Sequence, residues 1–382
     1  MSVAAPTTAP TGAGILLLSC GENMNDVTVA VPVPKTVDDL DATWLEQALQ
    51  RACPGIQVTA LEVEKVLWGT STKVLVKAEY AGTEVVPPAQ LCIKGELDAR
   101  LADTYAALGI TPTEIEARFY RNLAPQLGVA TPRIWGAEAV AGQGGILVLD
   151  NLGVLGATFG APTQPWTVEQ VAAGLTTLAT LHGKSFDRAF AGKEQLSVGS
   201  KAVRDITQNV LFSEQNWSGV MAGPVADVLP AALHDRQRIL AGYRASYAIN
   251  DAQPLSLAHG DAHIGNTYID ADGQLLFLDW ATICLQPWAA DVAYFLVGSL
   301  AVDQRAAHEQ TLLRDYLTQL HAHGGPAIEW ETAWLAYRQN LLHGIIWATL
   351  PETMQARDGV LAMTQRFASA IVDHDTFGAL GV

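Results

Sequence analysis

The chain has 382 residues, of which 49% are hydrophobic, and its formal net charge is −16. This length and hydrophobic content allow two domains with substantial cores and argue against disorder in the body of the chain. The acidic balance, without any basic block, argues against nucleic-acid binding, and the four widely spaced cysteines argue against a zinc site or a disulfide framework.

The N-terminal residues 1–34 are rich in Ala, Thr, Pro and Gly, and this composition predicts a flexible leader. The apolar runs of the chain fall far short of the roughly 20 residues that a membrane span needs, so we expect no membrane partner and a cytoplasmic location. A short helix is predicted to begin at Val37. Its apolar side consists of Leu40, Trp44, Leu45 and Leu49.

Three strands are predicted next, over residues 58–68, 72–80 and 90–95. The turn Gly69-Thr70-Ser71 joins the first two, and Lys94 lies near the end of the third. The backbone amides or hydroxyls of such a turn can hold a phosphate group. By itself, however, the turn is equally typical of an ordinary hairpin.

A helix is predicted to begin at the segment Thr111-Pro112-Thr113-Glu114, which has the pattern of a capping box with proline at the first helical position. Glu116 and Tyr120 share one face of this helix. Because capping occupies Glu114, Glu116 is the better acidic partner for Lys94. The alternative is that Glu116 is a solvated helix residue.

Two further strands, over residues 133–140 and 145–150, complete a set of five. They end at Leu149 and Asp150, and glycines then mark the passage to a second domain. That domain is predicted to be mostly helical, with a capping box at Thr167 and an irregular insertion or lid over residues 190–230.

The most informative stretch is His259 to Asp279, which reads HGDAHIGNTYIDADGQLLFLD. Asp261 precedes Asn266 by five residues, and two short strands joined at Asp272-Gly273 lead to Asp279. Phosphoryl transfer requires such a set, in which one Asp accepts the hydroxyl proton while an Asn and a second Asp hold magnesium. The alternative is a hairpin whose Asp and Asn residues only form turns.

The motif HGDxHxxN, followed by a hairpin and LDW, resembles the aminoglycoside phosphotransferase and choline kinase family, relatives of the protein kinases. The ExxFY pattern that begins at Glu116 is similar to the ecdysteroid-kinase-like branch of that group. The resemblance implies that Lys94, held by Glu116, contacts the phosphates of ATP beneath the turn at Gly69, Thr70 and Ser71. It also implies that Leu149 and Asp150 form the hinge at the adenine.

Beyond the hairpin, a buried helix over residues 288–300 carries Asp291, which the resemblance identifies as a structural carboxylate. Three helices are predicted to follow, over about 303–323, 329–349 and 353–376. An aromatic stripe in the second of these is more typical of core than of a pocket wall, but it is also a candidate wall for the acceptor site. The stripe consists of Trp330, Trp334 and Tyr337.

The fold class predicted from these elements is α+β, with the bilobal architecture of protein kinases. We expect a flexible leader (1–34), an N-terminal nucleotide-binding lobe of antiparallel strands (35–152) and a larger, mainly helical catalytic and substrate-binding lobe (153–382). The predicted function is ATP-dependent phosphorylation of a hydroxyl group on a small molecule. Asp261 would be the base, Asn266 and Asp279 would hold Mg²⁺, and the expected cofactors are ATP and Mg²⁺.

The expected acceptor is a neutral, fairly apolar alcohol, because only two carboxylates occur in residues 327–350 and a polycation would need several. The alternatives are a cationic aminoglycoside- or choline-type substrate and a non-catalytic nucleotide-binding regulator. A protein kinase proper is disfavoured because the chain lacks GxGxxG, DFG and APE segments.

Overall fold

The computed structural model describes residues 31–102, 105, 111–190, 192–199 and 201–382. Residues Pro32–Val382 make up one compact unit. Most of the predicted leader lies outside the described residues. The predicted boundary between two domains at residue 152 stays a prediction.

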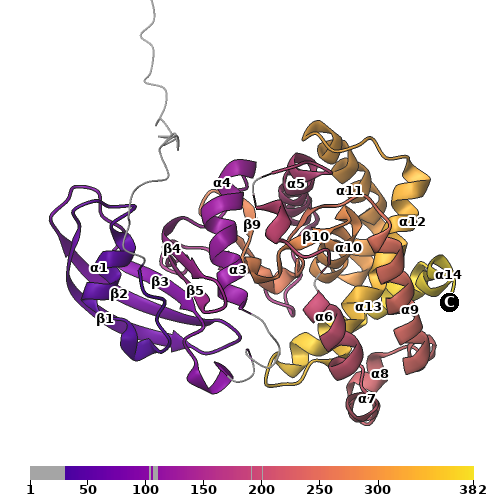
Figure 1. Ribbon diagram of the computed structural model, residues 1–382. Coiled ribbons are helices and arrows are strands. Elements are labelled where there is room, and N and C mark those ends of the chain that lie inside the picture. Colours follow the sequence, from indigo (N-terminus) through magenta and orange to yellow (C-terminus); the bar gives the residue numbers. More distant parts are fainter. Residues whose placement is uncertain (1–30, 103–104, 106–110, 191, 200) are drawn as a thin grey trace, which may run out of the picture. The chain divides into compact units, whose positions relative to one another are not determined.

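The N-terminal part of this unit contains five antiparallel strands in the spatial order β1-β2-β3-β5-β4 (Figure 1). The five predicted strands are confirmed, with ends that shift by at most one residue. In β2, alternate side chains are buried, as the two-residue period of a strand requires. The strands are β1 (Gln57–Leu67), β2 (Thr72–Ala81), β3 (Gln90–Gly95), β4 (Ile134–Val140) and β5 (Gly144–Asp150).

Helix α1 (Ala42–Leu49) packs against β1 and β4, and the apolar side chains predicted for its inner side are all buried. The predicted helix is in two pieces, because a short 3-10 turn (Val37–Asp39) precedes α1. Asp41 begins α1, since its side chain accepts a hydrogen bond from the backbone N–H of Trp44 at 2.7 Å.

Helix α3 (Pro112–Arg118) packs against β4 and β5 and continues through a π-helical turn (Phe119–Leu123) into α4 (Ala124–Leu127). The predicted capping box at its start is wrong, because the Thr111 side chain accepts no hydrogen bond from the helix backbone and instead donates to the Glu114 carboxylate at 2.9 Å.

The start of α3 is instead capped from outside the helix. Glu96, which follows β3, accepts hydrogen bonds from the N–H groups of Thr113 at 2.7 Å and Gly145 at 3.1 Å. Glu114 accepts from the N–H of Gly142 at 2.9 Å and from the Arg118 guanidinium at 2.7 Å. Residues distant in the sequence thus bond the N–H of Thr113 and the Glu114 carboxylate, two groups at the start of the helix that need partners.

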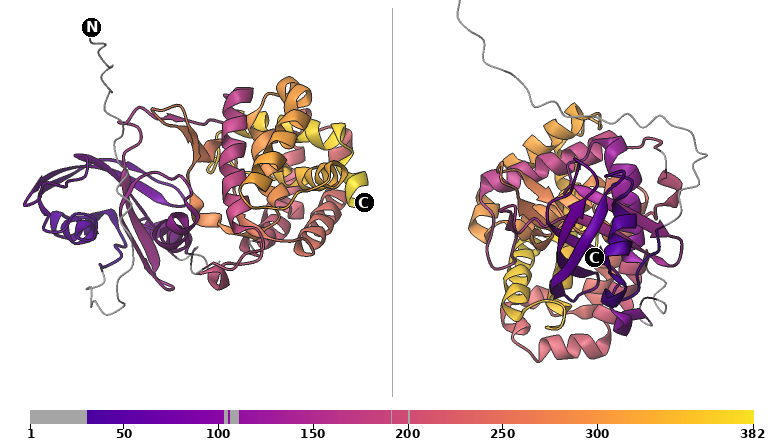
Figure 2. Two further views of the ribbon diagram at one scale, coloured as in Figure 1. Left: turned by 90° about the horizontal axis from the view of Figure 1, so that it is seen from above. Right: turned by 90° about the vertical axis from the view of Figure 1, so that its left-hand side faces the viewer.

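The C-terminal part is mainly helical and surrounds α10, in which 11 of 12 residues are buried (Figures 1 and 2). Helix α10 contacts α5, α11, α12 and α13, so it forms the centre of this core. The capping box at Thr167 and Gln170 is confirmed at the start of α5. The helices are α5 (Val168–Ser185), α6 (Lys201–Ile206), α7 (Glu214–Met221), α8 (Val225–Val228), α9 (Arg236–Asp251), α10 (Trp288–Ser299), α11 (Val302–Ala322), α12 (Trp330–Asn340), α13 (Arg357–Asp373) and α14 (Thr376–Leu380).

Two predictions for this part are wrong in detail. The segment 190–230, expected to be irregular, contains α6, α7 and α8. The helix expected over 329–349 is α-helical only in α12 and becomes a 3-10 helix at Leu341–Thr349. In that second half Gly344 lies directly against the ring of Phe367, where a Cβ atom would be 2.0 Å from the ring.

Short strands frame the stretch that carries the predicted catalytic residues. Strands β8 (Thr267–Ile269) and β9 (Leu275–Phe277) form the predicted hairpin, and β6 (Thr158–Phe159) pairs with β8. Strand β7 (Ser256–Ala258), which leads into His259, pairs with β10 (Cys284–Gln286). The loop between β7 and β8 is thus fixed at both ends by strand pairing.

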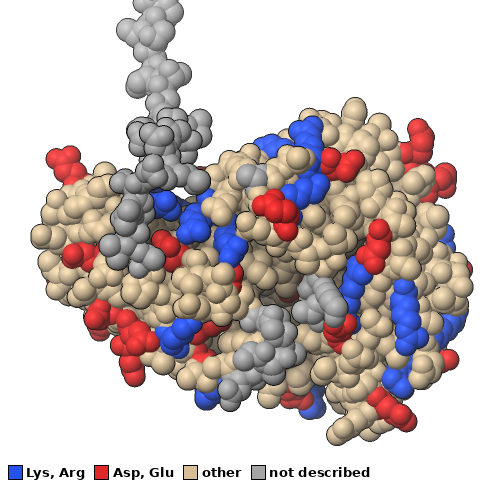
Figure 3. All heavy atoms as spheres, viewed as in Figure 1, with Lys and Arg blue, Asp and Glu red and all other residues tan. Residues whose placement is uncertain are grey.

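Two features of the structure bear on the partners of the chain: the distribution of surface charge and the hydrophobicity of the helices. On the face shown in Figure 3, acidic and basic side chains are interspersed among a majority of uncharged ones. Within the part of the chain that the structure describes, no helix combines the length and the hydrophobicity needed to cross a bilayer.

Candidate active site

A cavity of about 390 Å³ lies against one face of the five-stranded sheet. Strands β1, β2, β3 and β5 contribute to its lining, together with α3, the segment after β5 and residues from both ends of the β8–β9 hairpin. It therefore contains side chains from all the sequence segments predicted to bind nucleotide or metal, except the turn between β1 and β2.

The register of the sheet arranges the cavity wall in two rows. One row places Leu67, Lys73 and Lys94 side by side across β1, β2 and β3. The other places Leu75, Cys92 and Leu149 side by side across β2, β3 and β5. One end of the cavity wall is thus cationic and the other is apolar.

Lys94 is held between two carboxylates. Its Nζ atom lies 2.6 Å from Oε2 of Glu116 and 3.0 Å from Oδ1 of Asp279. Burial by itself lowers the pKa of Lys94, but Glu116 and Asp279 outweigh burial and raise it above its ordinary value. The lysine is therefore a fixed, permanent cation.

Glu116 is held by the residue that follows Asp279. Its Oε1 atom accepts a hydrogen bond from the backbone N–H of Trp280 at 3.3 Å, and its side chain is 1% exposed. The ring of Phe119, one turn along the same helix, stacks on Trp280 with ring centroids 4.2 Å apart. The alternative that Glu116 is a solvated helix residue is therefore wrong.

Asp279 has a strained backbone, with a φ of 60°, in the left-handed region that a non-glycine residue rarely adopts. This conformation places its carboxylate beside Lys94 at the edge of the cavity. Burial would raise the pKa of Asp279, but the positive charges of Lys94 and Lys73 lower it to about 2. Asp279 is therefore ionised at neutral pH.

Asp261 and Asn266 form one hydrogen-bonded unit in the loop before β8. The Asn266 Nδ2 atom donates to the backbone oxygen of Asp261 at 3.0 Å and to its Oδ2 atom at 3.2 Å. Asn266 lines the cavity, whereas the Asp261 carboxylate lies beside it and is 38% exposed. The Asp261 carboxylate is thus partly exposed beside the cavity, whereas Asn266 faces into the cavity.

His259 connects the two ends of the hairpin. Its Nδ1 atom accepts from the backbone N–H of Asp261 at 3.2 Å, and its Nε2 atom donates to the carbonyl of Leu278 at 2.7 Å. Burial lowers the pKa of His259, which keeps the ring neutral as these two bonds require. One imidazole therefore sets the distance between Asp261 and Asp279.

Asp291 anchors the same loop from α10. Its carboxylate accepts from the backbone N–H groups of His259 at 2.6 Å and Gly260 at 3.0 Å, which confirms the predicted structural role. Gly260 has a φ of 82°, and a Cβ atom there would be 2.2 Å from the carbonyl of Thr282. His182 contacts Asp291 at 3.2 Å and Tyr316 at 2.8 Å, so a buried chain of polar groups holds Asp291 in place.

The oxygen atoms at the cavity edge fit a magnesium ion. Because the Asn266 amide nitrogen bonds Asp261, its amide oxygen is the atom left for a ligand. Mg²⁺ prefers oxygen ligands and typically takes only one or two protein side chains in addition to phosphate and water. Among the described residues, no cluster of three or more His, Cys, Asp or Glu side chains could hold a metal ion by itself.

Most of the predicted site residues meet at this cavity. Lys94, Glu116, Leu149, Asp150, Asn266 and Asp279 all line it. Gly69, Thr70 and Ser71 do not line it, although they connect Leu67 and Lys73, which do. Lys73 was missed, since its position opposite Lys94 depends on the pairing register, which the sequence does not give.

The aromatic stripe of α12 does not line this cavity. Trp330 and Trp334 stack with ring centroids 5.4 Å apart, and Arg314 of α11 lies 3.5 Å above the ring of Trp330. The hydroxyl of Tyr337 donates to Glu309 of α11 at 3.0 Å. Tyr337 is buried in the helical core and the half-buried Trp330 and Trp334 pack against it, as such spacing more often gives. Their proposed part in an acceptor site stays a prediction.

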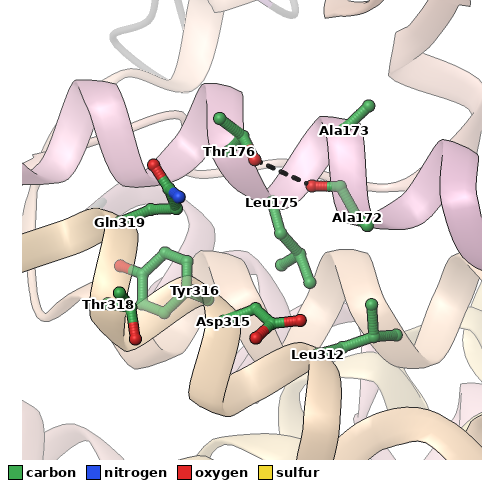
Figure 4. Close-up of a pocket in the computed structure, with 9 residues that line it drawn as sticks. All are labelled: Ala172, Ala173, Leu175, Thr176, Leu312, Asp315, Tyr316, Thr318 and Gln319. Carbon is green, nitrogen blue, oxygen red and sulfur yellow. Dashed lines mark hydrogen bonds between the residues drawn. The ribbon is translucent and has the colours of Figure 1, made fainter.

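A second hollow, of about 320 Å³, lies between α5 and α11 (Figure 4). Within it, Thr176 donates to the carbonyl of Ala172 in the same helix at 3.1 Å. Asp315 is the only carboxylate among its lining residues. The hollow brings together no set of catalytic groups, so it is not a candidate active site.

A double-mutant cycle on the Lys94–Glu116 pair should show strong non-additivity. We expect Lys94→Met and Glu116→Gln each to weaken Mg-ATP binding, and the double variant to bind little worse than Lys94→Met alone. The reason is that Glu116 acts by positioning Lys94, so its substitution has little further effect once the lysine is absent. Calorimetric dissociation constants measure this, and the Glu114–Arg118 pair of the same helix, which does not line the cavity, is the control. Strictly additive losses would show that Glu116 does not position Lys94.

Comparisons with known proteins agree with this geometry. Residues 111–343, more than half of the chain, match the sequence model of a family described as "Phosphotransferase enzyme family". Comparison with curated protein sequences finds no match.

Solved structures with a similar fold include a choline kinase from Streptococcus pneumoniae (14% identity, 83% of this chain, 94% of that chain, TM-score 0.46). A spectinomycin phosphotransferase solved with ADP and spectinomycin is also similar (14% identity, 88% and 99% coverage, TM-score 0.48). A third is an aminoglycoside phosphotransferase from Alicyclobacillus acidocaldarius (14% identity, 84% and 92% coverage, TM-score 0.47).

Proposed function

The chain belongs to the phosphotransferase enzyme family and is an ATP-dependent small-molecule kinase. We propose that it phosphorylates the hydroxyl group of a neutral, fairly apolar alcohol. The main support for this reaction is the placement of Lys94 between Glu116 and Asp279, next to the Asp261–Asn266 unit. This set of groups matches the requirements of phosphoryl transfer, in which catalysis is mostly positioning and neutralisation of charge.

In the proposed complex, the nucleotide occupies the cavity beside the sheet. The apolar row of Leu75, Cys92 and Leu149 provides a flat surface for the adenine, and the backbone at Leu149 and Asp150 provides hydrogen-bonding groups for its edge. The cationic end of the wall receives the phosphates. The turn of Gly69, Thr70 and Ser71 lies next to that end and covers them with its backbone amides.

The acceptor hydroxyl lies against Asp261, which orients it and takes its proton. Asn266 and Asp279 hold Mg²⁺, an ion that neutralises phosphate charge in this chemistry. The hydrogen bonds from Asn266 to Asp261 keep the base next to the metal ligands. His259 and Asp291 fix the loop, so little reorganisation is needed when substrates bind.

A small hollow on the other side of the catalytic loop supports a neutral acceptor. Gly260, next to Asp261, lines it, as do Tyr294 and His343, and it holds about 50 Å³. Its one lining carboxylate, Asp291, accepts hydrogen bonds from the backbone, and Arg204, the one arginine of the lining, forms a bidentate pair with Asp251. The described lining thus offers no spare carboxylate to the ammonium groups of a polycation.

We further propose that the chain belongs to the ecdysteroid-kinase-like branch of the family and acts in the cytoplasm. The support for the branch is the ExxFY pattern of α3, in which Glu116 pairs with Lys94 and Phe119 packs on Trp280. A sterol- or terpenoid-like acceptor fits this branch better than an aminoglycoside or choline.

Release of ADP in the presence of a panel of hydroxylated compounds tests the proposed function. We expect turnover with a neutral alcohol and a Michaelis constant for it that changes little between low salt and about 0.5 M salt, because no charge attraction is screened. A cationic acceptor such as kanamycin should be a poor substrate. Efficient kanamycin phosphorylation that falls steeply with salt would overturn the neutral class. Tight Mg-ATP binding without turnover on any compound would favour a regulator.

A further inference from the structure

Lys73 in β2 lies directly opposite Lys94 in β3, and both side chains line the nucleotide cavity. Directly opposed residues of an antiparallel pair project from the same face of the sheet. Two ammonium groups are therefore placed side by side. Such like-charge pairs destabilise a sheet unless negative charge offsets them.

The two lysines differ in their carboxylate partners. Lys94 has both Glu116 and Asp279 within 3.0 Å. For Lys73, in contrast, no ion pair to any carboxylate is found across the described ranges of the chain. The group of four side chains has two negative and two positive charges, so Lys73 is the member that balances the second carboxylate without touching it.

Lys73 nevertheless acts on the groups at this end of the cavity. In the thiol of Cys92, burial raises the pKa while Lys73 and Lys94 lower it. Lys73 is itself half-buried and lines the cavity, so its charge is placed at the cavity wall.

The remaining carboxylate of the cavity lies at its other end. Asp150 pairs in register with Leu91, three residues before Lys94, which corresponds to about 10 Å along a strand. It also accepts a hydrogen bond from Trp135 at 2.7 Å. The cationic row therefore lies where an anionic group of a ligand is attracted, away from the Asp150 carboxylate.

We propose that Lys73 is a second phosphate-binding residue, which contacts the polyphosphate chain of a nucleoside triphosphate beside Lys94. This inference rests on the proposed nucleotide site and adds to it a cation that is free to follow the ligand. Lys94 is fixed by its two carboxylates, whereas the half-buried Lys73 has no such tie. The phosphates provide the direct anionic contact that Lys73 lacks, which offsets the repulsion between the two lysines.

The test is calorimetric binding of Mg-ATP and of adenosine to the wild-type chain and to Lys73→Met. We expect the Mg-ATP dissociation constant to rise by about tenfold, as for loss of one charged hydrogen bond, while that of adenosine stays within about twofold. Lys73→Arg should restore most of the Mg-ATP affinity. The melting temperature of Lys73→Met should stay the same or rise, because the substitution removes a like-charge pair.

Lys77→Met is the matched control. Lys77 lies four residues further along β2 on the same face, is exposed and does not line the cavity, so its substitution should leave Mg-ATP binding unchanged. Absence of Mg-ATP binding by the wild-type chain would overturn the proposed function itself. Wild-type binding that Lys73→Met leaves intact would overturn the inference alone. An equal loss of ATP and adenosine binding, with a lower melting temperature, would overturn it in favour of a structural role.

Discussion

Replacing Asp261 by Asn should lower the turnover number by about 10²- to 10⁴-fold, the usual contribution of a positioned general base. The carboxylate accepts the amide of Asn266 at 3.2 Å and is open on its other side, where an acceptor hydroxyl would lie. An amide of the same shape keeps the bond from Asn266 through its oxygen but cannot accept the proton. We therefore expect Mg-ATP binding to change by no more than a few-fold. Steady-state ADP release and calorimetry measure the two effects separately.

Asp272→Asn is the control for this experiment. It removes the same charge from the exposed tip of the same hairpin, and Asn before Gly273 remains a favourable turn residue. Its turnover should match that of the wild-type chain. Normal turnover by Asp261→Asn with any accepted substrate would contradict the mechanism in which Asp261 is the base.

The second large effect is expected from Asp279→Asn, which should weaken binding of Mg-ATP itself by tenfold or more, on the order of one charged hydrogen bond or metal contact. Asp279 both lines the cavity and neutralises Lys94 at 3.0 Å, so its loss removes the proposed magnesium ligand and one of the two carboxylates that hold the lysine. A titration with Mg²⁺ at fixed ATP should show a raised magnesium requirement.

Asp150→Asn is the matched control for Asp279→Asn. It removes the charge of another aspartate that lines the cavity, and the new amide oxygen can still accept the hydrogen bond from Trp135. Its Mg-ATP affinity should change little. Equal losses in the two variants would show that general negative charge, and not a metal ligand at residue 279, determines binding.

The low pKa of Asp279 also gives this carboxylate a defined pH dependence. Its pKa is about 2 in the folded chain, against an ordinary value of 3.8. Because the folded value is the lower one, the stabilisation from the ionised carboxylate is present above about pH 4 and is lost as the pH falls toward 2. Magnesium binding through Asp279 should therefore be independent of pH between 5 and 8.

The sequence by itself determined the local elements and the catalytic hairpin. The five strands, the helix that carries Glu116 and the β8–β9 hairpin all follow from periodicity and turn residues, which depend on neighbours close in the chain. Asp261 and Asn266 belong to this group, since five residues of one loop separate them. Even the structural role of Asp291 followed from its place in a sequence motif.

Only the tertiary structure decided the contacts between distant segments. Glu96 caps α3 in place of the local capping box, the α12 stripe packs against α11, and Asp279 adopts a left-handed backbone conformation beside Lys94. Lys73 faces Lys94 because of the pairing register of β2 and β3. A single sequence gives the face of a strand but not its partner, because pairing is set by packing energies summed over the whole sheet.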